Sequence, residues 1–186
     1  FRVVNDGEFG TANHGTLILP PADITALDMR DESGDPQFTR FEEMIEGIDA
    51  EEYQPRPWLM VFVTADPCDE SCQERIHYLK ALHTLLGKNA PRVRRYYLHA
   101  GAEPLRQQDQ QLFRETYPSM GIAFTSGDAL QQDMAEAGVE MDLATGDYVL
   151  LVDPVGNVMM YYTKQQTHEE IMEDLERLVR VERRHD

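Results

Sequence analysis

Cys68 and Cys72 are the two cysteines of this 186-residue chain, and they lie four positions apart. A disulfide that closes such a short loop removes less conformational entropy from the unfolded chain than one that spans a domain. Stabilisation is therefore a weak reason for the pair, and redox or metal chemistry is the better one. An inert local disulfide and two unrelated buried thiols are the alternatives.

The residues before the pair form a continuous apolar run, Trp58–Val63, which is typical of a strand buried on both faces. Chemistry in an open α/β sheet collects beyond the carboxyl ends of the parallel strands, and Cys68 falls at that place. A helix is predicted to follow, with a buried face formed by Ile76, Leu79, Leu82, Leu85 and Leu86. Residues four apart share a helix face, with Cα atoms roughly 6 Å apart, which allows a disulfide or a shared soft metal ion. We expect both sulfur atoms to lie together on one exposed rim of the domain.

Two electrostatic effects act on the thiols in opposite directions. The amino terminus of a helix favours the thiolate of Cys68. Asp66, Asp69 and Glu70 place negative charge beside the motif, which disfavours a thiolate and favours a bound cation. Acidic residues also commonly occupy the first turn of a helix for structural reasons, so both interpretations stay open.

The rest of the chain alternates strands with helices. Strands are predicted at 93–98 and 122–124, and a hairpin at 148–162 turns through Asp153–Asn157. Helices are predicted at 105–116, from a cap at Ser126 or Asp128 to about Ala137, and after Thr167, which forms a capping box with Glu170. Such an order predicts a parallel core with right-handed crossovers, closed by an antiparallel hairpin and a last helix. The fold class is therefore α/β and thioredoxin-like, with a central mixed sheet flanked by helices.

Residues 1–56 are less regular than the rest of the chain. We predict that they form an N-terminal extension that packs on a thioredoxin-like domain at 57–186. Within the extension, Thr16–Leu19 is predicted to be a short strand stopped by Pro20 and Pro21, and Phe41–Ile48 a short helix.

Composition excludes several classes of partner. The chain carries 34 acidic against 17 basic residues, for a formal charge of −17, which argues against nucleic acid and against anionic membrane surfaces. No window approaches eighteen consecutive apolar residues, so no transmembrane helix is expected within this sequence. The chain begins at Phe1 without an initiator Met, and we expect an upstream segment, with a signal or anchor as one candidate.

From Trp58 to its end, the chain resembles the Sco/SenC family of thioredoxin-like copper and thiol proteins. The resemblance rests on the strand that leads into Thr64–Cys72 with its C-x-x-x-C spacing, on Thr125–Asp128 before a helix, and on the hairpin segment Leu151–Asn157. It implies a membrane-anchored protein at the periplasmic face of the inner membrane, with the anchor before this chain. Copper is the implied cofactor, and the implied partner is a cytochrome c oxidase subunit or another periplasmic thiol or copper protein.

The chain departs from the family at the third copper ligand, a His a few residues ahead of the hairpin's Asp153-Pro154. The corresponding stretch, Asp142–Asp147, contains no His, so the chain resembles a divergent member. His99 is the best substitute, because it follows the predicted strand 93–98 and should emerge at the same sheet edge as Cys68. The predicted metal ligands are therefore Cys68, Cys72 and His99, and loss of the metal site is the alternative.

Other candidate ligands are weaker. His14 lies in the extension, which could fold over the site, whereas we interpret His77, His83, His168 and His185 as surface or packing residues. Met159 and Met160 are adjacent in a strand and point to opposite faces, so they are better explained as core residues.

Three functions follow from these observations. The first is a Sco-like factor that uses the dithiol for copper delivery or thiol reduction during cytochrome c oxidase assembly. The second is a general thiol-disulfide oxidoreductase in which Cys68 attacks and Cys72 resolves. The third is a binding module whose disulfide is only structural.

Overall fold

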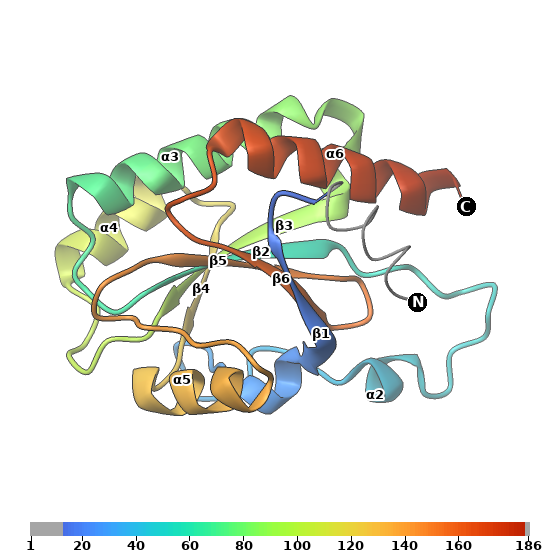
Figure 1. Ribbon diagram of the computed structural model, residues 1–186. Coiled ribbons are helices and arrows are strands. Elements are labelled where there is room, and N and C mark those ends of the chain that lie inside the picture. Colours follow the sequence, from blue (N-terminus) through green and yellow to red (C-terminus); the bar gives the residue numbers. More distant parts are fainter. Residues whose placement is uncertain (1–12, 185–186) are drawn as a thin grey trace.

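A six-stranded mixed sheet forms the centre of the molecule (Figure 1). The computed structural model describes residues 13–184, with side chains described up to residue 180. The strands are β1 (Thr16–Asp23), β2 (Trp58–Thr64), β3 (Val93–His99), β4 (Gly121–Phe124), β5 (Tyr148–Val152) and β6 (Asn157–Tyr162), in the order β1-β6-β5-β2-β3-β4. β2, β3 and β4 are parallel, whereas β5, β6 and β1 add antiparallel strands on the other side of β2. The predicted mixed sheet is confirmed.

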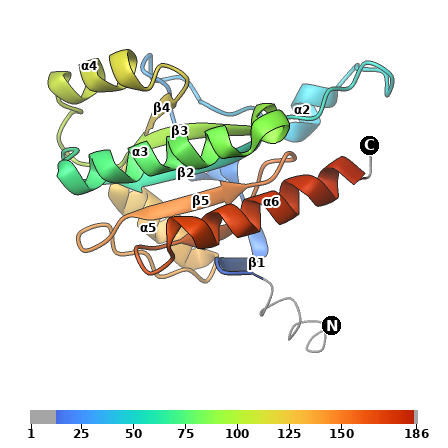
Figure 2. The ribbon, with the colours of Figure 1, turned by 90° about the horizontal axis from the view of Figure 1, so that it is seen from above.

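Helices cover both faces of this sheet. One face carries α3 (Glu70–Leu85), α4 (Gln107–Thr116) and α6 (His168–Arg184), and the other carries α5 (Gly127–Glu136) and the short 3-10 helix Ile24–Leu27 (Figure 1). Seen from above, α3 and α6 lie next to each other over the central strands (Figure 2). A second 3-10 helix, Gly87–Arg92, connects α3 to β3, and α2 (Phe41–Ile45) lies at one end of the sheet. The predicted capping box of α6 is confirmed, because Thr167 and Glu170 exchange side-chain to backbone hydrogen bonds of 2.8 and 3.1 Å.

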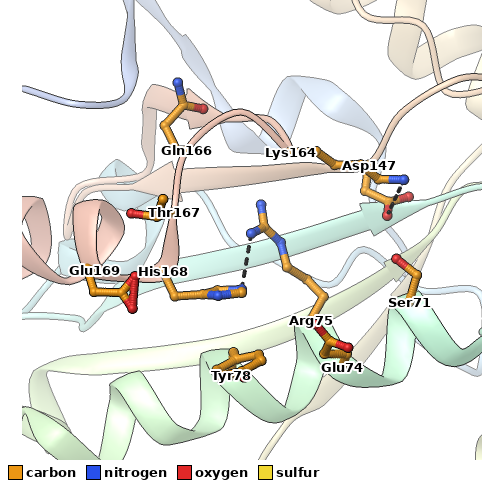
Figure 3. A pocket seen from close by; sticks show the side chains of 10 residues that line it. All are labelled: Ser71, Glu74, Arg75, Tyr78, Asp147, Lys164, Gln166, Thr167, His168 and Glu169. Carbon is orange, nitrogen blue, oxygen red and sulfur yellow. Dashed lines mark hydrogen bonds and ion pairs between the residues drawn. The ribbon is translucent and has the colours of Figure 1, made fainter.

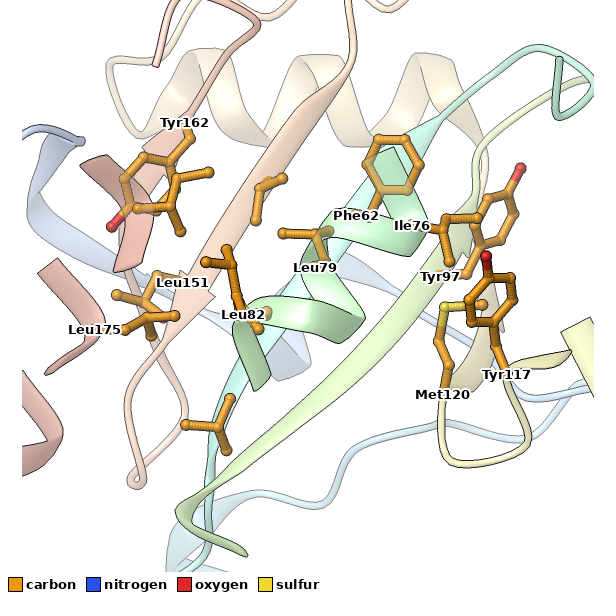
Figure 4. Packing of buried hydrophobic residues seen from close by; sticks show 14 of the residues in the cluster. Phe62, Ile76, Leu79, Leu82, Tyr97, Tyr117, Met120, Leu151, Tyr162 and Leu175 are labelled. Carbon is orange, nitrogen blue, oxygen red and sulfur yellow. The ribbon is translucent and has the colours of Figure 1, made fainter. Parts of the chain in front are cut away.

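The sheet separates two hydrophobic clusters, and β2 contributes side chains to both of them. Met60 and Phe62 face α3, α4 and α6, whereas Val61 and Val63 face α5. All four side chains are buried, which explains why β2 is apolar without alternation. Figure 4 shows the first cluster, in which residues of α3 and α6 pack on β2, β3 and β5. Each fully buried side chain of this size contributes roughly 1.5–3 kcal/mol to folding, before the loss of conformational entropy.

The buried face of α3 differs from the prediction at its carboxyl end. Leu85 is 70% exposed, and Cys72 and Arg75 are buried in addition to the predicted Ile76. The face that meets the sheet repeats after three or four residues and includes both Leu82 and Leu86, so Leu85 falls outside it.

The first strand runs through the two prolines that were predicted to stop it. β1 extends to Asp23, with an irregularity in its pairing with β6 between Leu17 and Ala22. It lies at the edge of the sheet, where Pro20 and Pro21 need no partner for a missing N–H group. The boundary between an extension and a domain at residue 56 stays a prediction, but β1 belongs to the same sheet as the later strands.

A buried carboxylate fastens the start of the described chain to α6. Asp174 is fully buried and accepts hydrogen bonds from the backbone N–H groups of His14, at 3.1 Å, and Gly15, at 2.9 Å. It also accepts a hydrogen bond of 2.9 Å from the hydroxyl of Tyr162, and burial, followed by the charge of Asp174 and this hydrogen bond, raises the pKa of that hydroxyl. No helix among residues 13–184 combines the length and apolar composition needed to cross a membrane.

Candidate redox site

Cys68 and Cys72 form a disulfide at the carboxyl end of β2. Their sulfur atoms are 2.05 Å apart and their Cα atoms 5.1 Å apart. β2 ends at Thr64, Cys68 lies in the connection, and Cys72 is in the first turn of α3. The prediction that the two sulfur atoms are close enough to bond is therefore confirmed.

The expected exposure of the pair is wrong. Cys68 is 1% exposed and Cys72 is 3% exposed, and both belong to the hydrophobic cluster beneath α3. The helix face that Cys72 shares with Ile76 and Leu79 is the face that packs on the sheet, so the spacing that brings the sulfurs together also buries them. An external thiolate therefore needs a local opening of the structure to reach either sulfur.

Asp69 has a structural task in the motif. It is the N-cap of α3, and its Oδ1 accepts a hydrogen bond of 2.9 Å from the backbone N–H of Cys72. Its carboxylate therefore fixes the first turn that carries the second sulfur. Of the two interpretations left open for the acidic residues, capping is the one that the structure shows for Asp69.

An ion pair at the start of α4, formed by a buried Asp and a partly exposed Arg, holds the other cysteine. Asp109 is 2% exposed, and its Oδ2 accepts a hydrogen bond of 3.1 Å from the backbone N–H of Cys68. Arg106 donates to both carboxylate oxygens of Asp109, at 3.1 Å each, and to the carbonyl oxygen of Cys68 at 3.3 Å. Sequence analysis did not select these two residues. Their only local signal is the i, i+3 spacing of opposite charges in a polar helix, which is common on helix surfaces.

Tyr97 belongs to the hydrophobic cluster that contains the disulfide, and it carries a hydroxyl group that can donate a hydrogen bond. Its side chain is fully buried against Phe62 and Phe113, and its hydroxyl has no hydrogen-bond partner among the described residues. Burial raises the pKa of Tyr97, and the charges of Asp109 and Asp147 raise it further. The phenol therefore stays neutral and keeps its proton.

The stretch in which the resemblance placed a His does lie near the motif. Burial raises the pKa of Asp147, and the charges of Asp69 and Asp66 add to this effect. Lys164 opposes it, with its Nζ 3.7 Å from Oδ2 of Asp147. Negative charge is therefore concentrated around the disulfide. These carboxylates disfavour the thiolate form of either cysteine after reduction.

His99 does not join the cysteines in a ligand set. It is the last residue of β3, it is 7% exposed, and its Nε2 lies 2.6 Å from the carbonyl oxygen of Glu103. Within residues 13–184, no group of three or more His, Cys, Asp or Glu side chains is arranged to hold a metal ion. In the disulfide both sulfur donors are bonded to each other, and no described His, Asp or Glu completes a ligand set of three with them.

The remaining candidates lie in other contacts. His14 packs on α6, with ring nitrogens 3.3 Å from Glu170 and 2.9 Å from Glu173. His77 is exposed, and the Nε2 of His83 bonds to the carbonyl oxygen of Ala90 at 2.7 Å. Met160 is buried in the core, as predicted, and His185 lies outside the described residues. His168 lines a pocket that is described below.

Solved structures of low sequence identity share the fold. Copper-bound ScoI of Arabidopsis thaliana matches with a TM-score of 0.51 and 15% identity, over 67% of this chain and 84% of that one. BsSco, described as a Sco-family cytochrome c oxidase assembly protein with a disulfide switch, matches with a TM-score of 0.52 and 13% identity, over 90% of this chain and 95% of that one. A thiol:disulfide interchange protein from Bacteroides sp. matches with a TM-score of 0.50 and 13% identity, over 89% of this chain and 90% of that one. The resemblance to Sco proteins is thus confirmed in the thioredoxin-like fold.

Sequence comparison gives the family. Among curated proteins, none matches this sequence. The family model described as the transmembrane-like, thioredoxin-like C-terminal domain matches residues 58–182, which include β2, the disulfide and almost all of α6. The chain belongs to this family of thioredoxin-like C-terminal domains.

Proposed function

We propose that this protein is a thiol-disulfide exchange protein that works through Cys68 and Cys72. One observation carries the proposal: the two cysteines form a disulfide where the central parallel strand β2 meets the amino terminus of α3. The bond closes a loop of only five residues, so it constrains the unfolded chain less than a long-range disulfide does. Its position at the carboxyl edge of the sheet suits chemistry better than stapling.

The exchange conserves atoms and electrons. The reduced protein carries two thiols, and one cysteine thiolate attacks a substrate disulfide, forms a mixed disulfide and releases the first substrate thiol. The other cysteine thiolate then displaces the second substrate thiol and closes the Cys68–Cys72 bond. Two electrons pass to the substrate, and the two protein thiol protons end on the two substrate thiols. In our assignment, Cys68 attacks and Cys72 resolves.

The setting that we propose is Sco-like. The domain acts at the periplasmic face of the inner membrane, held by an anchor outside this chain, and reduces target cysteines during cytochrome c oxidase assembly. Similarity in fold to BsSco supports this setting. We favour thiol reduction over copper delivery because His99 is held by Glu103 and supplies no third ligand beside the cysteines.

A redox titration tests exchange directly. We expect a reversible two-electron transition with a potential above about −300 mV, within reach of biological thiol couples. Cys68→Ser and Cys72→Ser should each abolish turnover of a disulfide substrate, whereas Ser33→Ala, which alters a hydroxyl in an exposed loop, should retain it. A potential far below about −300 mV would mark the bond as structural and reject the proposal.

Copper binding and cellular role need separate measurements. We expect reduced protein to retain less than one Cu(I) per chain on a desalting column, with no change in His99→Ala. Retention of one Cu(I) that depends on Cys72 would restore copper delivery. In cells, loss of the protein should lower cytochrome c oxidase activity, and the wild-type gene but not Cys68→Ser should restore it. Normal oxidase activity without the protein would reject the assembly role alone.

A further inference from the structure

A pocket of about 440 Å³ lies between α3 and the connection from β6 to α6 (Figure 3). Ser71, which directly precedes Cys72, lines the pocket, and so does Arg75, which follows Cys72 by one helical turn. On the opposite wall are Lys164 and His168. The pocket therefore adjoins the helical turn that carries Cys72, and it has its own set of polar groups.

Arg75 is the unusual residue of this pocket. It is 9% exposed, and its guanidinium lies between His168 and the pair formed by Asp147 and Lys164 (Figure 3). Its two terminal nitrogens donate to His168 Nε2 at 3.3 Å and to the carbonyl oxygen of Thr163 at 3.1 Å, whereas its Nε has no partner among the described residues. A buried guanidinium normally has a carboxylate or phosphate partner, because desolvation of an unpaired charge is unfavourable.

The charged residues near Arg75 do not supply such an anionic partner. Burial lowers the pKa of Arg75, and the charge of Asp147 opposes this effect from a distance. Asp147 itself is paired with Lys164 at 3.7 Å. No carboxylate within residues 13–180 forms a salt bridge with Arg75 within the usual 4 Å limit. A buried cation with a free donor and no ion-pair partner is suited to receive an anionic group from outside.

The other walls support the same conclusion. α6 begins at His168, and the amino terminus of this 17-residue helix favours negative charge. His168 stacks on Tyr78 with ring centroids 4.4 Å apart, and burial and the charge of Arg75 lower the pKa of His168. His168 is therefore neutral at pH 7, and it accepts a hydrogen bond from Arg75 instead of repelling it.

The acidic residues of the pocket limit the charge of its ligand. Glu74, Asp147 and Glu169 line the pocket together with the two cations Arg75 and Lys164. A doubly charged group such as a phosphate would be repelled by these carboxylates more strongly than a single carboxylate group, which can pair with Arg75. Cys72 and Arg75 are three positions apart on α3, so their Cβ atoms are roughly 5–6 Å apart. A small ligand bound at Arg75 is therefore held beside the helical turn that carries Cys72.

We propose that this pocket binds the carboxylate of a small disulfide or thiol substrate and presents its sulfur to the cysteine pair. This inference rests on the proposed exchange activity and adds the substrate class. The exchange remains the balanced reaction given above, with the carboxylate-bearing disulfide as the oxidant of the reduced protein. The net charge of −17 repels anions at long range, so a preference for this class requires local recognition at Arg75.

Rates of oxidation by two disulfides test the proposal. Reduced protein is mixed with 3,3′-dithiodipropionate, which carries carboxylates, or with 2-hydroxyethyl disulfide, which is neutral, and loss of free thiol is followed. The measured quantity is the ratio of the two rate constants. We expect Arg75→Gln to lower this ratio about tenfold, Lys164→Gln to lower it about threefold, and Arg75→Lys to retain most of it. Lys164 is 60% exposed, so its variant should fold even where Arg75→Gln does not.

Arg180→Gln is the charge-matched control, because Arg180 is exposed on α6 and pairs with Glu176. An equal ratio in wild type, Arg75→Gln and Arg180→Gln would overturn the pocket and leave the exchange function intact. If neither disulfide oxidises the wild type, the proposed exchange function is rejected. A binding measurement then tests the pocket independently of exchange. The probe is then 3-(methylsulfanyl)propanoate, which carries the carboxylate but cannot exchange. Calorimetric binding to wild type and loss of binding in Lys164→Gln or Arg75→Gln would support the pocket, and no binding to wild type would reject it.

Discussion

The backbone N–H of Cys68 donates a hydrogen bond of 3.1 Å to the buried carboxylate of Asp109, which lies 41 positions later in the chain. Arg106 completes the contact by binding both Asp109 and the carbonyl oxygen of Cys68. The same carboxylate thus positions the first cysteine and places a negative charge beside a residue that becomes a thiolate during exchange. We therefore expect this one side chain to affect both the position and the reactivity of Cys68, and the two effects can be separated by substitution.

Asp109→Asn removes the charge and keeps an oxygen that can accept the Cys68 N–H. If the lost repulsion is about 1 kcal/mol, reduction of the disulfide by dithiothreitol should become about fivefold faster and the potential should rise by about 20 mV. Alkylation of the released thiols, followed by mass spectrometry, measures the rate. Asp133→Asn on α5 is the control for net charge, because α5 lies on the opposite face of the sheet. Equal rates for both variants would show that the Asp109 charge does not act on the cysteines.

Removal of the Asp174 carboxylate should loosen the start of the described chain. Asp174→Ala leaves the N–H groups of His14 and Gly15 and the hydroxyl of Tyr162 without their acceptor. The free energy of unfolding should fall by about 3–5 kcal/mol, as measured by urea denaturation. Glu176→Gln on the same helix, where the side chain is 45% exposed, should change it by less than about 0.5 kcal/mol. A small effect of Asp174→Ala would mean that water replaces the lost acceptor.

His14 should make stability depend on pH near neutrality. The hydrogen bond to Glu173 raises the pKa of His14, and the charges of Asp174, Glu173 and Glu170 also favour its protonated form. A raised pKa in the folded state contributes stability that is fully present below the unfolded value near 6.5 and is lost as pH rises through the folded value. His14→Gln should therefore destabilise the protein more at pH 5.5 than at pH 8.5. The same loss at both values would show that the ring charge is not involved.

His168 should show the opposite sign. Burial and the charge of Arg75 lower its pKa, so the neutral ring is favoured in the folded state. Its contribution is present above the unfolded pKa and is lost as pH falls through the folded value. Relative to wild type, His168→Gln should become more favourable as the pH is lowered from 7.5 to 5. Denaturation curves at both pH values measure this change, and His77→Gln is the exposed control. An equal response of the two variants to pH would contradict the expectation.

Close approach of the backbone beside the site leaves no space for a side chain at Gly101. A Cβ there would overlap the carbonyl oxygen of Ala65 and lie 2.9 Å from the His99 ring. Gly101→Ala should reduce the free energy of unfolding by about 1–3 kcal/mol in thermal or urea denaturation. The control is Gly146→Ala, where the nearest atom would be 3.8 Å away and the effect should be neutral or slightly stabilising. Similar losses in both variants would refute the steric explanation.

Local patterns in the sequence predicted much of the architecture. The apolar run of β2, the hairpin at Asp153–Asn157 and the capping box at Thr167 were all found as predicted, and they led to the mixed sheet. The position of Cys68 between strand and helix was also predicted. These features depend on residues within about one turn or one strand of each other, so the chain specifies them without reference to its tertiary structure.

Tertiary packing decided the rest. Burial of the disulfide depends on which face of α3 meets the sheet, and passage of β1 through Pro20 and Pro21 depends on its edge position. The contact of Asp109 with Cys68 joins residues 41 positions apart, and that of His14 with Asp174 joins residues 160 positions apart. Charged residues at such positions look like ordinary helix surface in the sequence. Only the assembled layers bury them, and burial gives their hydrogen bonds and charges their strength.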